Sequence, residues 1–253
     1  MSEQFLSRRI ADCVAFNQGK PSMPEWLHVL AIASLAAGAV CALVVAVDVL
    51  RYPQHTWIMN IVWPVTALFG VVLCTWFYFR HGRQTQGKKM GTEVPFPIAV
   101  AKGALHCGAG CTLGDIVAEW LAVLAPAVAV AFGWHSIFPD KIFAVWVIDY
   151  LLAFAFGIAF QYFTIAPMRG LSVGQGLLVA LKADTLSLTA WQAGMYGFMA
   201  FAYFFLFGTL LDVHLEASSP EFWFMMQFGM LAGFCTSFPI NWWLVRAGLK
   251  ERM

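Results

Sequence analysis

The residues best suited to chemistry lie close together in a segment that is otherwise apolar. An imidazole, two thiols and two carboxylates occur within it, at His106, Cys107, Cys111, Asp115 and Glu119. The last four recur at every fourth position, which places them along one face of an α-helix. Thiolates and imidazoles bind Cu(I) and Zn(II), and carboxylates add negative charge and accept protons. These five residues are therefore predicted to form a metal or redox site.

A purely structural interpretation of this segment competes with the functional one. Small Cys and Gly side chains let helices pack closely, and carboxylates can hydrogen bond to neighbouring helices. Charged groups inside a membrane-spanning helix cost a few kcal/mol or more, however, and usually serve a function. That cost favours function for the complete pattern, whereas the two thiols alone fit either interpretation.

Two further carboxylates extend the pattern to other apolar segments. Asp149 lies inside one segment and Asp184 near the start of another, so a path from Asp149 through Glu119 and Asp115 towards Asp184 could relay protons or cations. Alternatively, Asp184 pairs with Lys182 or caps a helix. Local partners could also hold each carboxylate, the candidates being Asn60, Thr66, Gln161, Gln192 and Asn241.

Histidines and methionines offer weaker candidates for metal binding. One histidine falls in each predicted outer connection, and the three together could form a site of metal uptake: His55, His135 and His214. Thioether ligands for Cu(I) could come from Met225, Met226 and Met230. Solvated loop histidines and packed or lipid-facing methionines explain the same residues without a ligand.

The composition indicates a membrane protein. Only 11% of the 253 residues are charged and 60% are hydrophobic, whereas about 25% of the residues in a soluble domain are charged. There is no basic-aromatic patch of the kind that binds nucleic acid. P-loop, HExxH and dinucleotide-binding motifs are also absent from the sequence, so a nucleotide-driven pump or a hydrolase of the HExxH type is unsupported.

Six apolar runs predict an all-α, polytopic membrane helix bundle of about six transmembrane helices; they cover residues 27–50, 56–79, 98–134, 142–163, 171–207 and 222–245. Two of them, 98–134 and 171–207, exceed the roughly 20 residues that a span needs. The first either tilts steeply or begins as an interfacial helical lead-in and breaks near Gly108–Gly110. Lys102 favours the lead-in and the break, because an ammonium prefers the headgroup level, and the second run is also expected to begin with a lead-in. His106, Cys107 and Cys111 would then lie at the cytoplasmic mouth, with Asp115 and Glu119 deeper in the membrane.

The distribution of basic residues predicts the topology. In a six-span arrangement, thirteen lysines and arginines fall on one side and only Arg51 and Lys141 on the other. By the positive-inside rule both termini are cytoplasmic, N-in and C-in. Residues 1–25 would form a cytoplasmic N-terminal segment and residues 26–253 a single transmembrane domain.

Five longer blocks resemble a bacterial multi-pass membrane family catalogued only as a domain of unknown function. They read WPVTAL (63–68), HCGAGCTLGD (106–115), IAPMRG (165–170), ADTLSLTAWQ (183–192) and PINWWL (239–244). The resemblance covers most of the chain after about Trp57. It implies a helical membrane domain of the bacterial inner (plasma) membrane, and some members carry the label copper oxidase.

The leading hypothesis from the sequence is the handling of a transition metal, as copper transport or delivery that could be coupled to protons. Copper or zinc is the candidate ligand, and the lipid bilayer is the expected partner, with a homo-oligomer or a larger membrane complex compatible with the sequence. One alternative is a membrane oxidoreductase that uses thiols, a metal or a quinone. The other is a structural or assembly subunit, so the sequence leaves open whether the protein is an enzyme.

Overall fold

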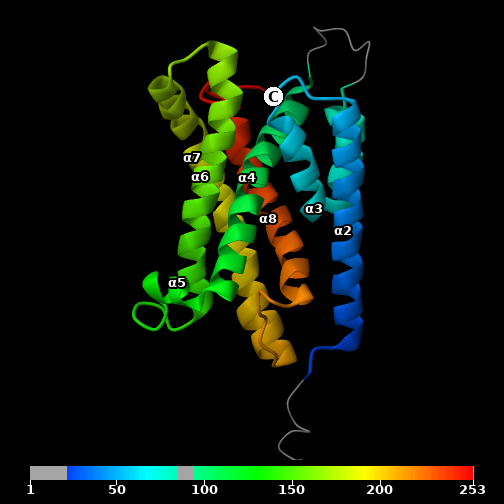
Figure 1. Ribbon diagram of the computed structural model, residues 1–253, viewed down its shortest axis with the longest axis vertical. Helices are drawn as coiled ribbons and strands as arrows, with labels where there is room; N and C mark the ends of the chain where they lie inside the picture. Colours follow the sequence, from blue (N-terminus) through cyan, green and yellow to red (C-terminus); the bar gives the residue numbers. More distant parts are fainter. Residues whose placement is uncertain (1–21, 85–93, 253) are drawn as a thin grey trace, which may run out of the picture.

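The structure, a computed structural model, is an all-helical bundle that describes residues 22–84 and 94–252, of which 166–169 by their backbone alone (Figure 1). The helices are α2 (Glu25–Arg51), α3 (Met59–Phe77), η1 (Tyr78–Gly82), α4 (Phe96–Leu124), α5 (Pro126–Ala131), α6 (Lys141–Arg169), α7 (Val173–Ala200), η2 (Phe201–Leu211) and α8 (Pro220–Arg246). Six segments are long and apolar enough to cross a membrane, as predicted. Residues 1–21, most of the predicted cytoplasmic segment, lie outside the described residues.

The exterior of the bundle is apolar, and much of its polar content lies inside. Large apolar side chains such as Leu50, Leu124 and Val72 are 70–80% exposed, whereas Asp115, Asp149 and Asp184 are fully buried. A water-soluble protein shows the reverse pattern, because its surface must be hydrated. The exposed apolar faces therefore contact the lipid bilayer.

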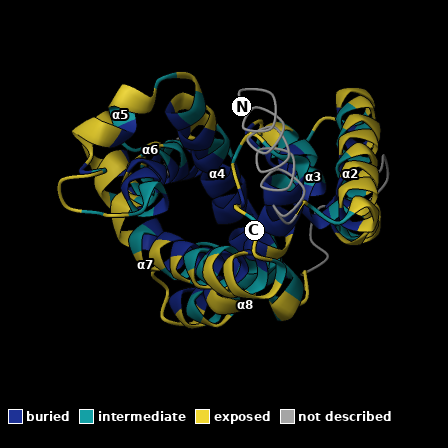
Figure 2. Cartoon of the chain, turned by 90° about the horizontal axis from the view of Figure 1, so that it is seen from below, coloured by how far each residue is buried: buried dark blue, intermediate teal, exposed yellow. Residues whose placement is uncertain are grey.

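Helix α4 occupies the centre of the bundle and is mostly buried (Figure 2). It packs against α3, α6, α7 and α8. Small residues permit this close packing, since Gly110 lies against the backbone of Gly157 in α6, and Gly114 against that of Ala153. Gly108 lies under the Trp191 ring of α7. The glycines of α4 thus let neighbouring helices approach its backbone.

The break predicted near Gly108–Gly110 is wrong. Helix α4 runs without interruption from Phe96 to Leu124 and ends just before Pro126. The excess length of the 98–134 run is taken up after the span, by the short helix α5 and the turn that follows it. The 171–207 run is likewise continuous from α7 into η2. A proline, which disfavours helical conformation in the residue before it, marks the interruption better than the glycines do.

The segment from Met59 to Gly82 is a helical hairpin that folds back halfway through the bundle. Val71, inside α3, has φ 41° and ψ −119°, which no helix allows. The Trp63 ring lies 5.3 Å from the Tyr78 ring, centroid to centroid. In a straight helix these residues would be about 22 Å apart. The chain therefore reverses at Val71, so that the arm 59–70 and the arm 72–82 lie side by side.

Both ends of this hairpin lie at the end of the bundle where α2 finishes. Asp48, near the end of α2, accepts hydrogen bonds from the Tyr78 hydroxyl (2.8 Å) and from Nε of Arg83 (2.9 Å). Arg83 is also 4.2 Å from the centre of the Tyr52 ring. Figure 1 shows α3 beside only the upper part of α2. The hairpin is thus re-entrant and does not cross the bundle.

The tip of the hairpin is stabilised by side chains from two other helices. Reversal at Val71 takes the Leu68 carbonyl out of the regular helical pattern, and Nε2 of Gln227 donates to it at 2.9 Å. The Ser34 hydroxyl in turn donates to Oε1 of Gln227 at 2.6 Å. Irregular backbone at membrane depth is tolerated only where protein or water satisfies it, and α8 and α2 satisfy it here.

The re-entrant hairpin changes the predicted topology. His28 and Glu221 form an ion pair of 2.6 Å, so α2 and α8 begin at the same end of the bundle. Both then run to the opposite end, which places Ser22 and Arg252 at opposite ends (Figure 1). Among the described residues, five of the six segments run the length of the bundle and the sixth turns back, whereas the sides of the membrane on which the two ends of the chain lie stay a prediction.

Candidate functional site

The five residues singled out in the 106–119 segment lie on α4 in the interior of the bundle. His106, Cys107, Cys111 and Asp115 are fully buried, and Glu119 is 4% exposed. Cys107, Cys111, Asp115 and Glu119 follow one face of the continuous helix over about 18 Å, by helical rise. The imidazole and the thiols were predicted at the cytoplasmic mouth of a helix that begins near Leu113, whereas α4 is continuous through them and all three side chains are buried.

The two thiols lie together, and the imidazole points elsewhere. Cys107 and Cys111 lie one helical turn apart on the same face of α4, close enough to interact. His106 instead packs its ring edge-on against Phe160 of α6, with centroids 5.9 Å apart. Across the described residues, no three His, Cys, Asp or Glu side chains converge on a point that would hold a metal ion.

Three buried carboxylates form an acidic cluster between α4 and α6, namely Asp115, Glu119 and Asp149. Each lies close enough to the others for electrostatic interaction. Gln192 of α7 donates to Oδ1 of Asp115 at 3.0 Å. Within the described residues, Oδ2 of Asp115, Oε1 of Glu119 and both carboxylate oxygens of Asp149 have no hydrogen-bond partner. Of the local partners proposed from the sequence, only Gln192 binds one of these carboxylates.

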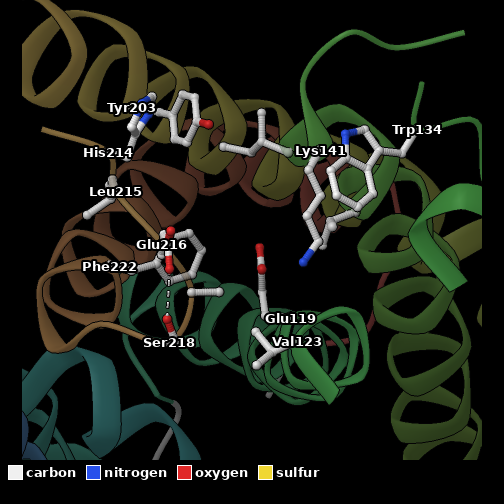
Figure 3. A pocket seen from close by; sticks show the side chains of 13 residues that line it. Glu119, Val123, Trp134, Lys141, Tyr203, His214, Leu215, Glu216, Ser218 and Phe222 are labelled. Atoms are coloured by element: carbon white, nitrogen blue, oxygen red, sulfur yellow. Dashed lines mark hydrogen bonds between the residues drawn. The ribbon is translucent and has the colours of Figure 1, made fainter. Parts of the chain in front are cut away.

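A cavity of about 440 Å³, here called the vestibule, opens from the end of the bundle where α8 begins. Six of its lining residues are Glu119, Lys141, Tyr203, His214, Glu216 and Phe222. The Glu119 carboxylate points into it from α4, and the Lys141 ammonium approaches Glu119 from the facing wall (Figure 3). Lys141 is held by a 2.9 Å hydrogen bond to the Ala122 carbonyl. Glu119 thus links the vestibule to the acidic cluster.

The other end of the polar interior holds an ion pair that the sequence did not predict. Nζ of Lys250 lies 2.7 Å from Oδ1 of Asp184, and both side chains are fully buried. The sequence suggested Lys182 or a helix cap as the partner of Asp184, and both suggestions are wrong. Lys250 and Asp184 also act electrostatically on His106. We call the region around Lys250 and Asp184 the inner end.

The three histidines expected at an outer site of uptake do not share a face. His135 and His214 lie in the connections 132–140 and 212–219 at the vestibule end, where His214 lines the vestibule. The ring of His135 stacks on Trp134, with centroids 4.1 Å apart. His55 follows α2 at the opposite end, because the hairpin does not cross.

The three methionines of α8 face the protein interior. Met225, Met226 and Met230 are 2–6% exposed and belong to the main apolar core. The thioether of Met230 accepts a hydrogen bond from the Thr112 hydroxyl at 3.6 Å. Met230 therefore contacts α4 at Thr112, the residue that follows Cys111 in the sequence.

Sequence reasoning missed several residues that shape the site. In the sequence, Lys250 was used only as one of the thirteen basic residues on the predicted cytoplasmic side, and Lys141 only as one of the two basic residues on the other side. Neither lies within an apolar run, so hydropathy gave no signal for either. Ser187 and Ser237, whose hydroxyls lie 3.3 Å apart, join α7 to α8 at the inner end. Their spacing from the other polar residues carries no periodic signal, because the contact depends on how the two helices pack.

Comparison with known proteins gives a family but no function. No curated protein and no solved structure matches this chain. A family defined as Domain of unknown function (DUF4396) matches residues 98–250, which include nearly all of α4, the helices α6, α7 and α8, the acidic cluster, the two thiols and the ion pair of Lys250 with Asp184. The match covers more than half of the chain, and the chain therefore belongs to the DUF4396 family.

Proposed function

We propose that the protein translocates a cation across the membrane, with the proton as the simplest cargo. The observation that carries this proposal is the position of Glu119, at the base of the vestibule and beside two deeper carboxylates. Carboxylates that are buried this close together cannot all remain ionised without bound positive charge. Protons or cations would provide it, and would enter from the vestibule.

The order of groups along the bundle supports a relay. Glu119 leads to Asp115 and Asp149, then to the thiols of α4, and then to His106 and Asp184 at the inner end. Chains of Asp, Glu and His inside membrane bundles are typical of proton relays in pumps and transporters. The unbonded oxygens of Asp149 and Asp115 are groups that a proton or a cation would occupy.

Purified protein in liposomes loaded with a pH-sensitive dye tests this proposal. A potassium diffusion potential should drive proton uptake into liposomes that contain the wild type and not into empty ones. Glu119→Gln and Asp149→Asn should each lower the rate about tenfold or more, since a barrier raised by about 1.4 kcal/mol has that effect. Both substitutions keep the shape of the side chain but remove the acid.

The matched control is Asp212→Asn. Asp212 is exposed, lies beyond the relay and has a φ of 53°, a conformation that Asn tolerates well. This variant should conduct as the wild type does. Equal rates in wild-type and empty liposomes would contradict the proposal, and co-purification with a larger complex would then favour the assembly-subunit alternative.

A soft metal ion such as Cu(I) is the second candidate cargo. The specific observation in its favour is the buried pair of Cys107 and Cys111, one helical turn apart, which lies between the acidic cluster and the inner end. Thiolates select Cu(I), and the Met230 thioether nearby is a ligand of the same class. In this version Cys107 and Cys111 would hold the ion in transit.

A further inference from the structure

The side chain of Lys250 fills a place inside the bundle, although the residue lies beyond the last helix. Helix α8 ends at Arg246, and the chain then turns at Gly248, whose φ of 71° suits glycine. The backbone amides of Leu249 and Lys250 both donate to the Leu244 carbonyl, at 3.0 and 3.3 Å. These contacts direct the Lys250 side chain into the interior, where it is fully buried.

The ammonium of Lys250 contacts two oxygen atoms, and Asn241 binds one of the two residues that provide them. Oδ1 of Asp184 lies at 2.7 Å and the Ser187 hydroxyl at 3.4 Å. Asn241 uses its amide nitrogen to donate to Ser187 at 2.6 Å and to the Ser237 carbonyl at 2.9 Å. Its own Oδ1, like Oδ2 of Asp184, is buried and has no hydrogen-bond partner in the described part of the chain.

These groups have the composition of a site for a hard cation. Carboxylate, amide and hydroxyl oxygens are the ligands that such ions prefer. Three of the oxygens are presented by Asp184, Ser187 and Asn241, and the one full negative charge belongs to Asp184. Gly103 of α4 leaves space beside them, since a Cβ added there would lie 3.9 Å from both Oδ1 of Asn241 and Cε of Lys250.

We propose that Asp184, Ser187 and Asn241 form a site for a monovalent cation such as K⁺, and that the Lys250 ammonium is its built-in occupant. The ammonium group and K⁺ carry the same charge and are of similar size, so the two would compete for the same oxygens. For its role this inference rests on the proposed function: a cation leaving the acidic cluster would have to displace Lys250 to reach the inner end.

Thermal unfolding in detergent tests the site without any measurement of transport. In choline chloride, Lys250→Met should unfold roughly 5 °C or more below wild type, because Asp184 loses its counter-charge. Potassium chloride at the same ionic strength should restore most of that loss. The double variant Asp184→Asn with Lys250→Met removes both charges, so it should unfold at the same temperature in the two salts.

The matched control is Arg252→Met, which removes a positive charge from the same segment. Arg252 lies 5.1 Å from the centre of the Phe96 ring and does not contact the oxygen cluster. Its melting temperature should be independent of K⁺. If Lys250→Met lowers the unfolding temperature equally in both salts, the proposal is overturned and Lys250 and Asp184 form a structural ion pair.

A second measurement uses the wild type and so does not depend on a variant that folds. Displacement of Lys250 by K⁺ should increase its reaction with a water-soluble acylating reagent, measured by mass spectrometry, relative to choline chloride. The exposed Lys182 should react equally in both salts. Equal labelling of Lys250 in both salts would count against the proposal. A protein that passes these tests but carries no flux would retain the site and lose the proposed function.

Discussion

At the scale of single residues, burial without partners distinguishes this interior from ordinary packing. A buried carboxylate normally has a counter-charge or several hydrogen bonds, because leaving it bare costs several kcal/mol. Asp184 has Lys250, and Asp115 accepts a hydrogen bond from Gln192 at one of its two oxygens. Asp149 has no hydrogen-bond partner among the described residues. The uncompensated groups lie next to the vestibule, where ions from water would reach them first.

The thiol pair allows a direct test of the copper version. Wild-type protein exposed to Cu(I) under reducing conditions and then desalted should retain about one copper per chain if Cys107 and Cys111 bind it together. Cys107→Ser with Cys111→Ser should retain almost none. The exposed Cys235 supplies the control, since Cys235→Ser should keep the wild-type amount. Elemental analysis measures all three, and a copper-free wild type would leave the proton as the cargo.

At the scale of helices, hydropathy predicted which segments are apolar but not the path that they take. The runs 56–79 and 222–245 look alike to such a measure, yet one reverses and the other crosses. The reversal depends on contacts with distant residues, namely Asp48, Ser34 and Gln227. The every-fourth spacing is a local property of the sequence, and it placed four residues on one face of α4 correctly. The burial of that face and the contact of Lys250 with Asp184 depend on how the helices pack, so the sequence did not predict them.

Val71 offers a test of the reversal. Its φ of 41° is unfavourable for a β-branched residue and ordinary for glycine. Val71→Gly should therefore raise the free energy of unfolding by about 1 kcal/mol. The neighbouring Val72 is 70% exposed and lies within the helical returning arm. Val72→Gly should therefore lower the free energy of unfolding by about 0.5 kcal/mol. Denaturation in detergent compares the two, and a loss in both would indicate a straight helix.

At the scale of the whole molecule, the hairpin redistributes the basic residues between the two ends of the bundle. Arg51, at the end of α2, lies on the side that holds Arg83 and Arg246. Among the described residues, Lys141 alone then remains at the vestibule end, where it faces Glu119. The positive-inside rule accordingly predicts that the vestibule opens away from the cytoplasm.

Cysteine labelling in intact cells tests this topology. His55 is exposed in the connection after α2, so the hairpin predicts that His55→Cys is protected from a membrane-impermeant maleimide. A sixth crossing would place it outside and allow reaction. Ser136→Cys, exposed at the vestibule end, should react in either case. Wild type provides the baseline for the native cysteines, and labelling of His55→Cys would refute the hairpin topology.

The unit formed by α4, α6, α7 and α8 begins and ends at one end of the bundle, since the rings of Phe96, at the start of α4, and Trp242, near the end of α8, lie 4.7 Å apart, centroid to centroid. The family match starts at residue 98 and ends at residue 250, and so covers this unit. A unit whose two ends meet on one face can be inherited as a module. Relatives could gain, lose or exchange whatever precedes it without inverting the orientation of the acidic cluster in the membrane.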